Sequence, residues 1–479
     1  MIFNSLSFAV FLPIVFVLYW FVTKSKLRAQ NLLLLAASYF FYASWDWRFM
    51  FILIGSTLLD YFTGIKIHNA LTPSTKKFWL WLSVSINLGV LGVFKYYDFF
   101  VESFAAGLSG LGFNVNYSTL NLILPVGISF YTFHGLSYVI DLYRDKIKPE
   151  LNFINYSLFV SFFPLLVAGP IERATHLLPQ IQKPRTFDYA RAVDGMRQIL
   201  WGLFKKIVIA DNCAVYVNQI FVTSDDHSGS TLLVAAVFFA FQIYGDFSGY
   251  SDIALGTARL FGIELLRNFS FPYFSRDIAE FWRRWHISLS NWFRDYLYIP
   301  LGGSRFGKWK AVRNTLIIFV VSGFWHGANW TFIAWGTFHA LLFLPLLLLE
   351  RNRVNTNTVA ENRFFPNLKE LFQMTFTFFL VVLGWIFFRA KDINHALDYL
   401  STLFSKSIFY APVYGFGFNK SFIFILFMLL VEWVQREKQH GLELSGVKNK
   451  YVKWSIYYAL ILVIFEFGAN SKSFIYFQF

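Results

Sequence analysis

The stretch NTLIIFVVSGFWHGANWTFIAWGTFHALLFLPLLLL, residues 314–349, decides the fold class of this chain. Its apolar residues fall into two segments on either side of a short interruption at Gly327–Asn329. Arg313 precedes the stretch and Arg351 follows it, and basic residues mark the cytoplasmic side of a membrane. Both ends are therefore expected on one side, which predicts a re-entrant helix pair that carries His326 at its deep turn.

Apolar segments recur along the whole chain. The sequence is 56% hydrophobic and 15% charged, whereas a soluble domain carries about 25% charged residues. The segments are long and few turn dipeptides divide them, which favours helices over strands. We expect an all-α, polytopic integral membrane protein with about 11 spans, besides re-entrant and interfacial helices. The predicted helical segments are 6–23, 31–45, 48–65, 78–96, 121–142, 153–169, 191–221, 231–247, 314–326, 331–349, 371–388, 420–435 and 453–468, with shorter, more polar pieces at 251–263 and 275–300.

The chain is predicted to form a single membrane-embedded domain over residues 1–479. No linker rich in Pro, Gly or Ser and no internal repeat divides it. The segment 6–23 lacks a basic preceding region and a small-residue cleavage site, so it is expected to be a retained span. Pro164 and Gly169–Pro170 interrupt segment 153–169, which predicts a second re-entrant pair, because broken backbone at membrane depth must be enclosed by protein.

His326 is the first candidate catalytic residue. An ionisable side chain inside a membrane is expensive to keep, so it indicates a functional site. A neutral imidazole buried among apolar neighbours resists protonation, which suits a general base that acts on a hydroxyl. Trp325, Trp330 and Gly327 adjoin it, and Asn329 could orient it or polarise a carbonyl. The alternative is a packed histidine that is hydrogen-bonded to a backbone carbonyl.

His286 is the second candidate, within the aromatic and basic segment Phe281–Ser290. Its alternative is an interfacial residue of an aromatic belt. His339 is interpreted as a packing residue and His134 as a weaker candidate. The remaining histidines are expected at the surface: His68, His176, His227, His395 and His440.

Two carboxylates, Asp246 and Asp252, stand in the polar segment 242–252 beside a predicted span. They are expected to pair with nearby arginines and to fix a broken helix. The serines between them do not have the spacing of a nucleophile elbow, so a Ser-His-Asp triad is not favoured.

The net charge of +14 is concentrated between Arg259 and Arg313, where ten basic residues face four acidic ones. One interpretation is contact with anionic lipid headgroups. The other is a cytoplasmic mouth for a polyanionic donor such as a coenzyme A thioester, bound by Arg283, Arg284 and Arg294. The basic residues lie between spans, so a nucleic-acid partner is not expected. One cysteine and the absence of zinc and nucleotide motifs argue against a disulfide, a metal site or a bound cofactor.

Several motifs together resemble the membrane-bound O-acyltransferase (MBOAT) family, with core motifs at about residues 120–340. The ends of the chain and one late segment resemble the alginate O-acetyltransferase (AlgI-type) branch of that family. The core motifs are 124–133, 168–173, 244–252, 281–290 with 292–296, and 324–330 with 335–336; those of the branch are 1–5, 384–390 and 474–479.

The resemblance implies an O-acetyltransferase with a helical shell around a central tunnel. His326 matches the family's catalytic histidine and His286 a second functional histidine. The implied reaction takes an acyl group, in this branch acetyl, from a cytoplasmic thioester such as acetyl-CoA or an acyl carrier. The acceptor would be an extracytoplasmic polysaccharide such as alginate, reached through a periplasmic or membrane-anchored acetyltransferase partner at a bacterial inner membrane. Candidate donor-binding residues are Arg283, Arg284, Arg294, Asn329, Trp325, Asp246 and Asp252.

Other functions remain open. Within the family, peptidoglycan O-acetylation and teichoic-acid D-alanylation are alternatives, and the segment Gly384–Ala390 argues against the second. A polysaccharide or lipid transporter would also use broken helices, but it predicts internal repeats. A non-catalytic export scaffold gives no reason to keep both tryptophan-flanked histidines.

Overall fold

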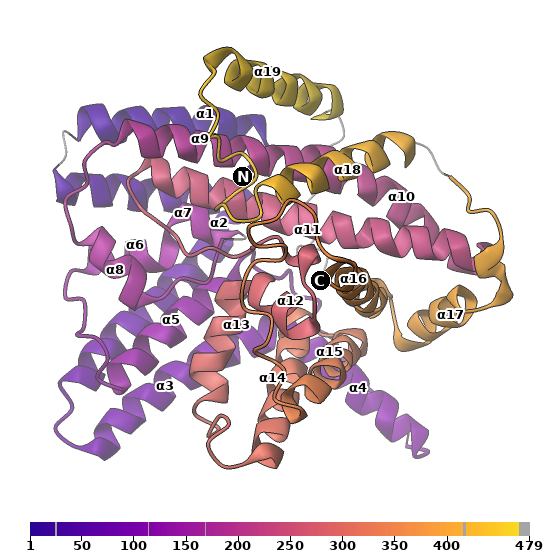
Figure 1. The fold of residues 1–479 in the computed structure, drawn as a ribbon. Coiled ribbons are helices and arrows are strands. Elements are labelled where there is room, and N and C mark those ends of the chain that lie inside the picture. The colour runs from indigo at the N-terminus through magenta and orange to yellow at the C-terminus, as the bar shows by residue number, and fades with distance from the viewer. Residues whose placement is uncertain (24–25, 114, 168, 415–417, 469–479) are drawn as a thin grey trace. The chain divides into compact units, whose positions relative to one another are not determined.

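The computed structural model describes residues 1–23, 26–113, 115–167, 169–414 and 418–468, and these residues form helices and no strand (Figure 1). The predicted all-α class is therefore confirmed. The closing segment 474–479 and Ala168 of the motif 168–173 lie outside the described residues. The chain divides into two compact units, Met1–Ala192 with Ala258–Leu266 and Val193–Thr257 with Arg267–Phe479. The prediction of a single membrane-embedded domain stays a prediction.

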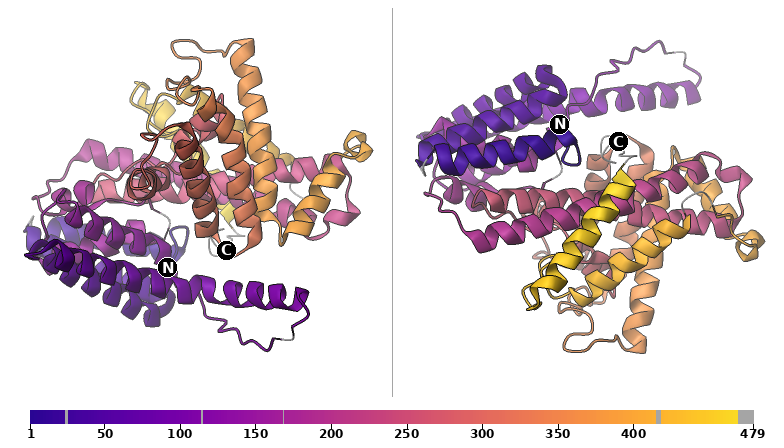
Figure 2. Two further views of the ribbon diagram at one scale, coloured as in Figure 1. Left: turned by 90° about the horizontal axis from the view of Figure 1, so that it is seen from below. Right: turned by 90° about the horizontal axis from the view of Figure 1, so that it is seen from above.

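The first unit holds the N-terminal helices together with the start of α9 and the end of α11. The elements α3, η2 and α4 follow one another directly, and α4 extends beyond the rest of this unit (Figure 2). Ala105 is the one buried residue of α4. The elements are α1 (Leu6–Val17), η1 (Leu18–Val22), α2 (Leu27–His68), α3 (Pro73–Leu91), η2 (Gly92–Tyr96), α4 (Tyr97–Gly110), α5 (Ile128–Tyr143), α6 (Phe153–Ser161), α7 (Phe163–Leu166), α8 (Ala174–Ile181) and α9 (Tyr189–Leu203).

The second unit holds the rest of α9 and α11 and all later elements. These are η3 (Phe204–Ala210), α10 (Asp211–Val222), η4 (Ser224–Asp226), α11 (Gly229–Leu260), η5 (Pro272–Phe274), α12 (Ile278–Arg284), α13 (Ile287–Phe293), η6 (Arg294–Tyr298), α14 (Lys308–His326), α15 (Trp330–Leu348), α16 (Leu368–Arg389), α17 (Ile393–Leu403), η7 (Lys406–Phe409), α18 (Phe418–Val434) and α19 (Lys450–Phe467).

Among the described residues, five helical stretches are long and apolar enough to cross a membrane. This agrees with a multi-pass membrane protein, while the expected number of about 11 spans is not confirmed. Several expected spans are shorter or broken helices in the structure. The five stretches are Leu27–His68, Pro73–Gly110, Gly229–Leu260, Trp330–Leu348 and Leu368–Arg389.

Polar residues and glycine set the helix limits in the first unit. The predicted segments 31–45 and 48–65 are joined in α2, but Asp46 lies in an extended conformation (φ −156°, ψ 111°) and bends the helix between them. The predicted segment 121–142 becomes helical only after Gly127, which has φ 74°. A Cβ atom added at Gly127 would lie 2.0 Å from the Leu166 carbonyl oxygen, so the close approach requires glycine.

The helix interruption predicted near Pro164 is confirmed. The segment divides at Phe162 into α6 and the single-turn helix α7, which has Pro164 near its start. Proline lacks an amide hydrogen and fits the first turn of a new helix better than a helix interior. That this pair re-enters the membrane stays a prediction.

Helices α14 and α15 form the predicted helix pair and lie side by side (Figure 1), while its re-entry into the membrane stays a prediction. Gly323 and Gly336 face each other at the crossing, with a Cβ atom added at either position 3.3 Å from the Cα of the other. A Cβ atom at Gly336 would also lie 2.2 Å from the Phe319 carbonyl oxygen. The absence of side chains at these two positions lets the helices approach closely and fixes the turn between them.

Candidate active site

The turn between α14 and α15 presents His326. Helix α14 ends at His326, Gly327 is extended, and Asn329 begins α15 as its N-cap. The Asn329 side chain accepts a hydrogen bond from the Thr331 amide (2.9 Å) and donates one to the Lys391 carbonyl oxygen (3.0 Å). These contacts fix the turn and give Asn329 a structural role in it. Donor binding by Asn329 stays a prediction.

Aromatic rings enclose His326, whose side chain is 4% exposed. The ring centroids of Trp325, Trp335 and Phe388 lie 5.0, 5.1 and 5.3 Å from that of the imidazole. Trp330, which adjoins His326 in the sequence, is 55% exposed. Besides Trp325, the enclosing rings come from Trp335 of α15 and Phe388 of α16.

His286 lies in the same unit, with its ring centroid 6.4 Å from that of His326. It separates the short helices α12 and α13 in the left-handed conformation (φ 44°, ψ 52°). Non-glycine residues seldom adopt this conformation, and such strain is frequent at functional sites. The side chain is 1% exposed and packs on the Phe247 ring at 4.6 Å. The structure thus brings the two candidate catalytic histidines together.

Asn268 fixes the proton on the His286 ring. Its Oδ1 accepts hydrogen bonds from the Ser288 amide (3.3 Å) and the Ser288 hydroxyl (2.9 Å), and it lies 3.1 Å from Nδ1 of His286. An amide N–H can only donate, so the atom that it meets is the oxygen, and Nδ1 must carry the ring proton. Nε2 then bears a lone pair, and no described residue forms a hydrogen bond to it.

The electrostatic surroundings keep His286 neutral. Burial lowers its pKa well below the ordinary value of a histidine. The side chain lies outside the five candidate spans and its described hydrogen-bond partner, Asn268, is uncharged. A neutral imidazole with an available lone pair can accept a proton or a hydrogen bond.

A pocket of about 420 Å³ opens between α13 and α14. On α14 it is lined by Thr315, Phe319 and Ser322, successive positions on the helix face that continues to His326. On α13 it is lined by Leu289 and Ser290, one turn after His286. Each of these two helices therefore carries one of the histidines, a single helical turn (about 5 Å) from the nearest residue that lines the pocket.

The three predicted donor-binding arginines take different places. Arg294 lines the pocket and pairs with Asp295 (2.7 Å). Arg283 instead donates hydrogen bonds to the carbonyl oxygens of Asn352 (2.7 Å) and Asn355 (2.6 Å), which holds the loop after α15 against α12.

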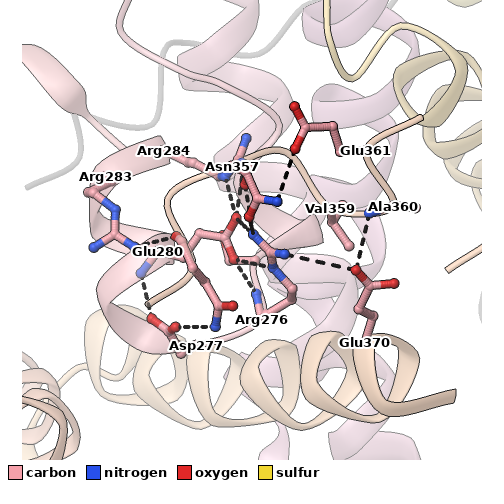
Figure 3. A network of polar contacts seen from close by, with 12 residues as sticks. Arg276, Asp277, Glu280, Arg283, Arg284, Asn357, Val359, Ala360, Glu361 and Glu370 are labelled. Atoms are coloured by element: carbon pink, nitrogen blue, oxygen red, sulfur yellow. Dashed lines mark hydrogen bonds and ion pairs between the residues drawn. The ribbon is translucent and has the colours of Figure 1, made fainter. Parts of the chain in front are cut away.

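Arg284 belongs to the ion-pair network centred on Glu280 (Figure 3). Glu280 accepts from Arg284 (2.9 Å) and from Arg276 (3.0 Å), and both arginines also donate to the Asn357 carbonyl oxygen. Arg283 and Arg284 thus anchor the loop that borders the pocket. That they bind donor stays a prediction.

Asp246 and Asp252 do not have the structural role that was predicted for them. Both lie within α11, which continues unbroken to Leu260, so the predicted helix break is wrong. Both form ion pairs with lysines of η3: Lys206 lies 2.7 Å from Asp246, and Lys205 lies 2.6 Å from Asp252. Charges this deeply buried require such pairing, which ties η3 to α11.

His339 and His134 are both buried, His339 in the second unit and His134 in the first. His339 packs among aromatic rings, with the centroid of Trp335 5.1 Å away, in accord with a packing role. In the first unit, Nε2 of His134 accepts a hydrogen bond from the Glu172 amide (3.1 Å). Within the described ranges, no group of three or more His, Cys, Asp or Glu side chains has the arrangement of a metal site.

Sequence reasoning missed Asn268, which comes from a segment remote in the sequence that no local pattern marks. Trp335 and Phe388 lie in motifs quoted for the family resemblance, but the sequence does not place them beside His326. The turn at Gly327–Asn329 separates Trp335 from His326, so no helical spacing links these two residues.

Two buried histidines on the helices that line a pocket, in a chain with several apolar helices long enough to span a membrane, agree with the class of an intramembrane transferase. A family model described as "MBOAT, membrane-bound O-acyltransferase family" matches residues 143–388. The chain is 41% identical over 408 residues to the probable alginate O-acetylase AlgI of Pseudomonas putida, which covers 85% of this chain and 80% of that protein.

Two other relatives have different names. The chain is 36% identical over 430 residues to the peptidoglycan O-acetyltransferase of Helicobacter pylori, covering 84% of this chain and 79% of that protein. It is 30% identical over 291 residues to the teichoic acid D-alanyltransferase of Bacillus subtilis, covering 57% of this chain and 71% of that protein. The chain belongs to the membrane-bound O-acyltransferase family. The predicted family and the predicted enzyme class, an O-acyltransferase in a multi-pass membrane protein, are confirmed.

Proposed function

We propose that this protein transfers acetyl from a cytoplasmic thioester to a hydroxyl of an extracytoplasmic polysaccharide, with His326 as the general base. The observation that carries the proposal is the pocket between α13 and α14, whose two walls lead to His286 and His326. Its position gives a small acyl group a route to the histidine pair.

The lining of the pocket suits acetyl-CoA or another thioester on a phosphopantetheine arm. Arg294 and Arg353 supply positive charge, which favours phosphate. Ile318, Phe319 and Phe343 form an apolar section that accepts an extended thioester arm. The cytoplasmic placement of this mouth follows from the basic segment Arg259–Arg313 and the positive-inside rule.

The chemical step balances without a metal or a redox partner. The lone pair of the neutral His326 ring takes the proton of the acceptor hydroxyl as its oxygen attacks the acyl carbon. The tetrahedral intermediate expels the thiolate, the C–S bond breaks, and the proton on His326 passes to the sulfur. The products are an O-acetyl ester and a free thiol.

His286 acts as a positioning residue in this proposal. Its Nδ1 proton is committed to Asn268, so Nε2 accepts and does not donate a hydrogen bond. Stabilisation of an oxyanion by His286 would need a hydrogen-bond donor at Nε2, which this tautomer does not provide. Nε2 can instead hold the imidazolium of His326 or the acceptor hydroxyl by accepting a hydrogen bond, since the rings lie 6.4 Å apart.

The first acceptor class is an alginate-like polysaccharide in a bacterial inner-membrane setting, as in the relatives named alginate O-acetylases. Transfer through a periplasmic or membrane-anchored acetyltransferase would carry acetyl from the protein to the polymer. Peptidoglycan is the second acceptor class, because the Helicobacter pylori relative aligns over a similar share of this chain.

A substitution that blocks the pocket between α13 and α14 tests the proposal. Ile318→Trp places a large ring in the pocket, whereas Val321→Trp adds the same ring to α14 at an exposed position outside the lining. In proteoliposomes with labelled acetyl-CoA, Ile318→Trp is expected to lose acetyl transfer and Val321→Trp to retain it. Equal transfer by both folded variants would refute the pocket as the donor route. Digestion of the labelled envelope with alginate lyase or with muramidase would identify the acceptor.

A further inference from the structure

A second cavity, the basic pocket, lies in the first unit and shares no lining residue with the pocket between α13 and α14. It has a volume of about 340 Å³ and forms where the loop between α8 and α9 meets η1 and the end of α11. Four cationic side chains line it, against the single carboxylate of Asp188: Lys183, Arg185, Arg191 and Arg259.

Two of these cations are already neutralised within the protein. Arg259 pairs with Glu264 (3.0 Å) at the end of α11. Arg191 lies 3.5 Å from Asp188, whose carboxylate also accepts a hydrogen bond from the Arg191 amide at the start of α9. Asp188 is thereby occupied as a helix cap and does not neutralise the rest of the pocket.

Arg185 is a buried cation that lacks a carboxylate partner among the described residues. Its side chain is 5% exposed, and its described contacts are a hydrogen bond to the Asn31 side chain and the Tyr19 ring, 5.7 Å from the guanidinium carbon. An isolated buried charge is strongly unfavourable unless a counter-ion or a polar ligand compensates it. Lys183, on the rim, also forms no ion pair with a described residue.

Apolar side chains border the same pocket. Trp20 lines it, donates a hydrogen bond to the Leu260 carbonyl oxygen (2.9 Å), and meets the Phe187 ring at 5.5 Å. Beside it, Val17 and Phe21 of the apolar α1–η1 segment are 49% and 68% exposed. A tryptophan between an apolar surface and a cationic pocket is the arrangement found at the interface of a bilayer.

We propose that the basic pocket binds the phosphate of an anionic phospholipid, with Arg185 and Lys183 as its counter-ions and the acyl chains along the exposed side of α1 and η1. A guanidinium donates hydrogen bonds to a phosphate in bidentate geometry, and the single carboxylate of the pocket, Asp188, is occupied by Arg191. The phosphate of a soluble molecule, such as inorganic phosphate or coenzyme A, would form the same ionic contacts, but such a molecule has no lipid chains that would cover the adjoining apolar surface.

Native mass spectrometry of the purified full-length protein tests the proposal. Phosphatidylglycerol, phosphatidylcholine, inorganic phosphate and acetyl-CoA would be titrated separately. Lys183→Gln is expected to weaken phosphatidylglycerol binding about fivefold, because one cation near a lipid headgroup contributes about that factor. Arg185→Gln is expected to weaken it about tenfold or more. Lys77→Gln, an exposed lysine of α3 in the same unit, is the matched control and should bind as the wild type does.

Retention of phosphatidylglycerol over phosphatidylcholine, reduced by Lys183→Gln and not by Lys77→Gln, would support the lipid site. Lys183 has no described partner to lose, so this variant tests binding even if Arg185→Gln fails to fold. Equal phosphatidylglycerol binding by the wild type and Lys183→Gln would overturn the proposal. So would a Lys183-dependent interaction with inorganic phosphate or acetyl-CoA but not with the lipid.

Discussion

Replacing Asn268 should impair acyl transfer although this residue is not expected to touch either substrate. Asn268→Leu keeps the approximate volume but removes the oxygen that accepts from Nδ1 of His286 at 3.1 Å. The change removes the acceptor of three hydrogen bonds, from Nδ1 of His286 and from the amide and hydroxyl of Ser288, and each buried donor left unsatisfied costs about 1–3 kcal/mol. It also frees the ring to place its proton on Nε2, the nitrogen that the proposed mechanism needs as an acceptor.

If the full penalty is paid in the transition state, 1–3 kcal/mol corresponds to a loss of about 5- to 150-fold in kcat, with little change in KM for the donor. Single-turnover transfer of labelled acetyl in proteoliposomes measures both quantities. Asn268→Asp retains the acceptor oxygen and is expected to keep much more activity than Asn268→Leu.

Ser288→Ala is the matched control, since it removes only the hydroxyl that shares the Asn268 oxygen at 2.9 Å and leaves the contact to His286. Its effect should be much smaller than that of Asn268→Leu. Wild-type kcat in a folded Asn268→Leu variant would refute the reasoning. An equal loss of activity in Asn268→Leu, Asn268→Asp and Ser288→Ala would show that Asn268 only stabilises the structure around α13.

Three further predictions concern the helix crossing, the ionisation of the site and the donor. Gly336→Ala introduces a Cβ atom 2.2 Å from the Phe319 carbonyl oxygen, so we expect destabilisation of about 1–3 kcal/mol, read as a lower melting temperature in detergent, together with reduced transfer. The lowered pKa of His286 keeps that ring neutral as the pH falls, so transfer should persist at pH 5.5, where a histidine with a pKa of about 6.5 would be about nine-tenths protonated; a pH–rate profile measures this. Arg294→Gln should raise the KM for acetyl-CoA about fivefold at nearly constant kcat, because it removes about 1 kcal/mol of attraction to phosphate in steady-state kinetics.

Each of these predictions has a contradicting result. Gly89→Ala, with no atom within 4 Å of the added Cβ, controls for the helix-wide effect of alanine, and equal melting temperatures for the two variants would exclude the crossing as a constraint. A steep loss of transfer between pH 7 and 6 that His286→Gln abolishes would contradict a neutral His286 with a lowered pKa. An unchanged KM in Arg294→Gln would remove this arginine from donor binding.

The helical class and the α14–α15 pair could be predicted because they depend on local patterns. Apolar length and the Gly327–Asn329 interruption mark the helix pair directly, and the bend at Asp46 is visible as a polar residue between two apolar segments. The helix limit at Gly127 was not predicted, because the predicted segment 121–142 runs through this glycine; its left-handed backbone and its close approach to Leu166 set the limit.

The partners of buried charges could not be predicted in the same way. Asp246 and Asp252 have arginines nearer in the later sequence, but the packing of η3 against α11 selects Lys206 and Lys205. The pairing of His286 with Asn268 depends on the left-handed backbone at a histidine, for which no sequence rule exists. Such contacts arise from long-range packing, and the spacing of residues does not encode them.

The most direct test of the central claim compares wild-type protein with His326→Ala at matched expression. The measurement is transfer of labelled acetyl from acetyl-CoA into cell-envelope polymer, with melting temperature as the check of folding. The account predicts a loss of about 10²- to 10⁴-fold in the initial rate, the usual contribution of a general base. Undiminished transfer by a folded His326→Ala variant would contradict the assignment of His326 as the catalytic base.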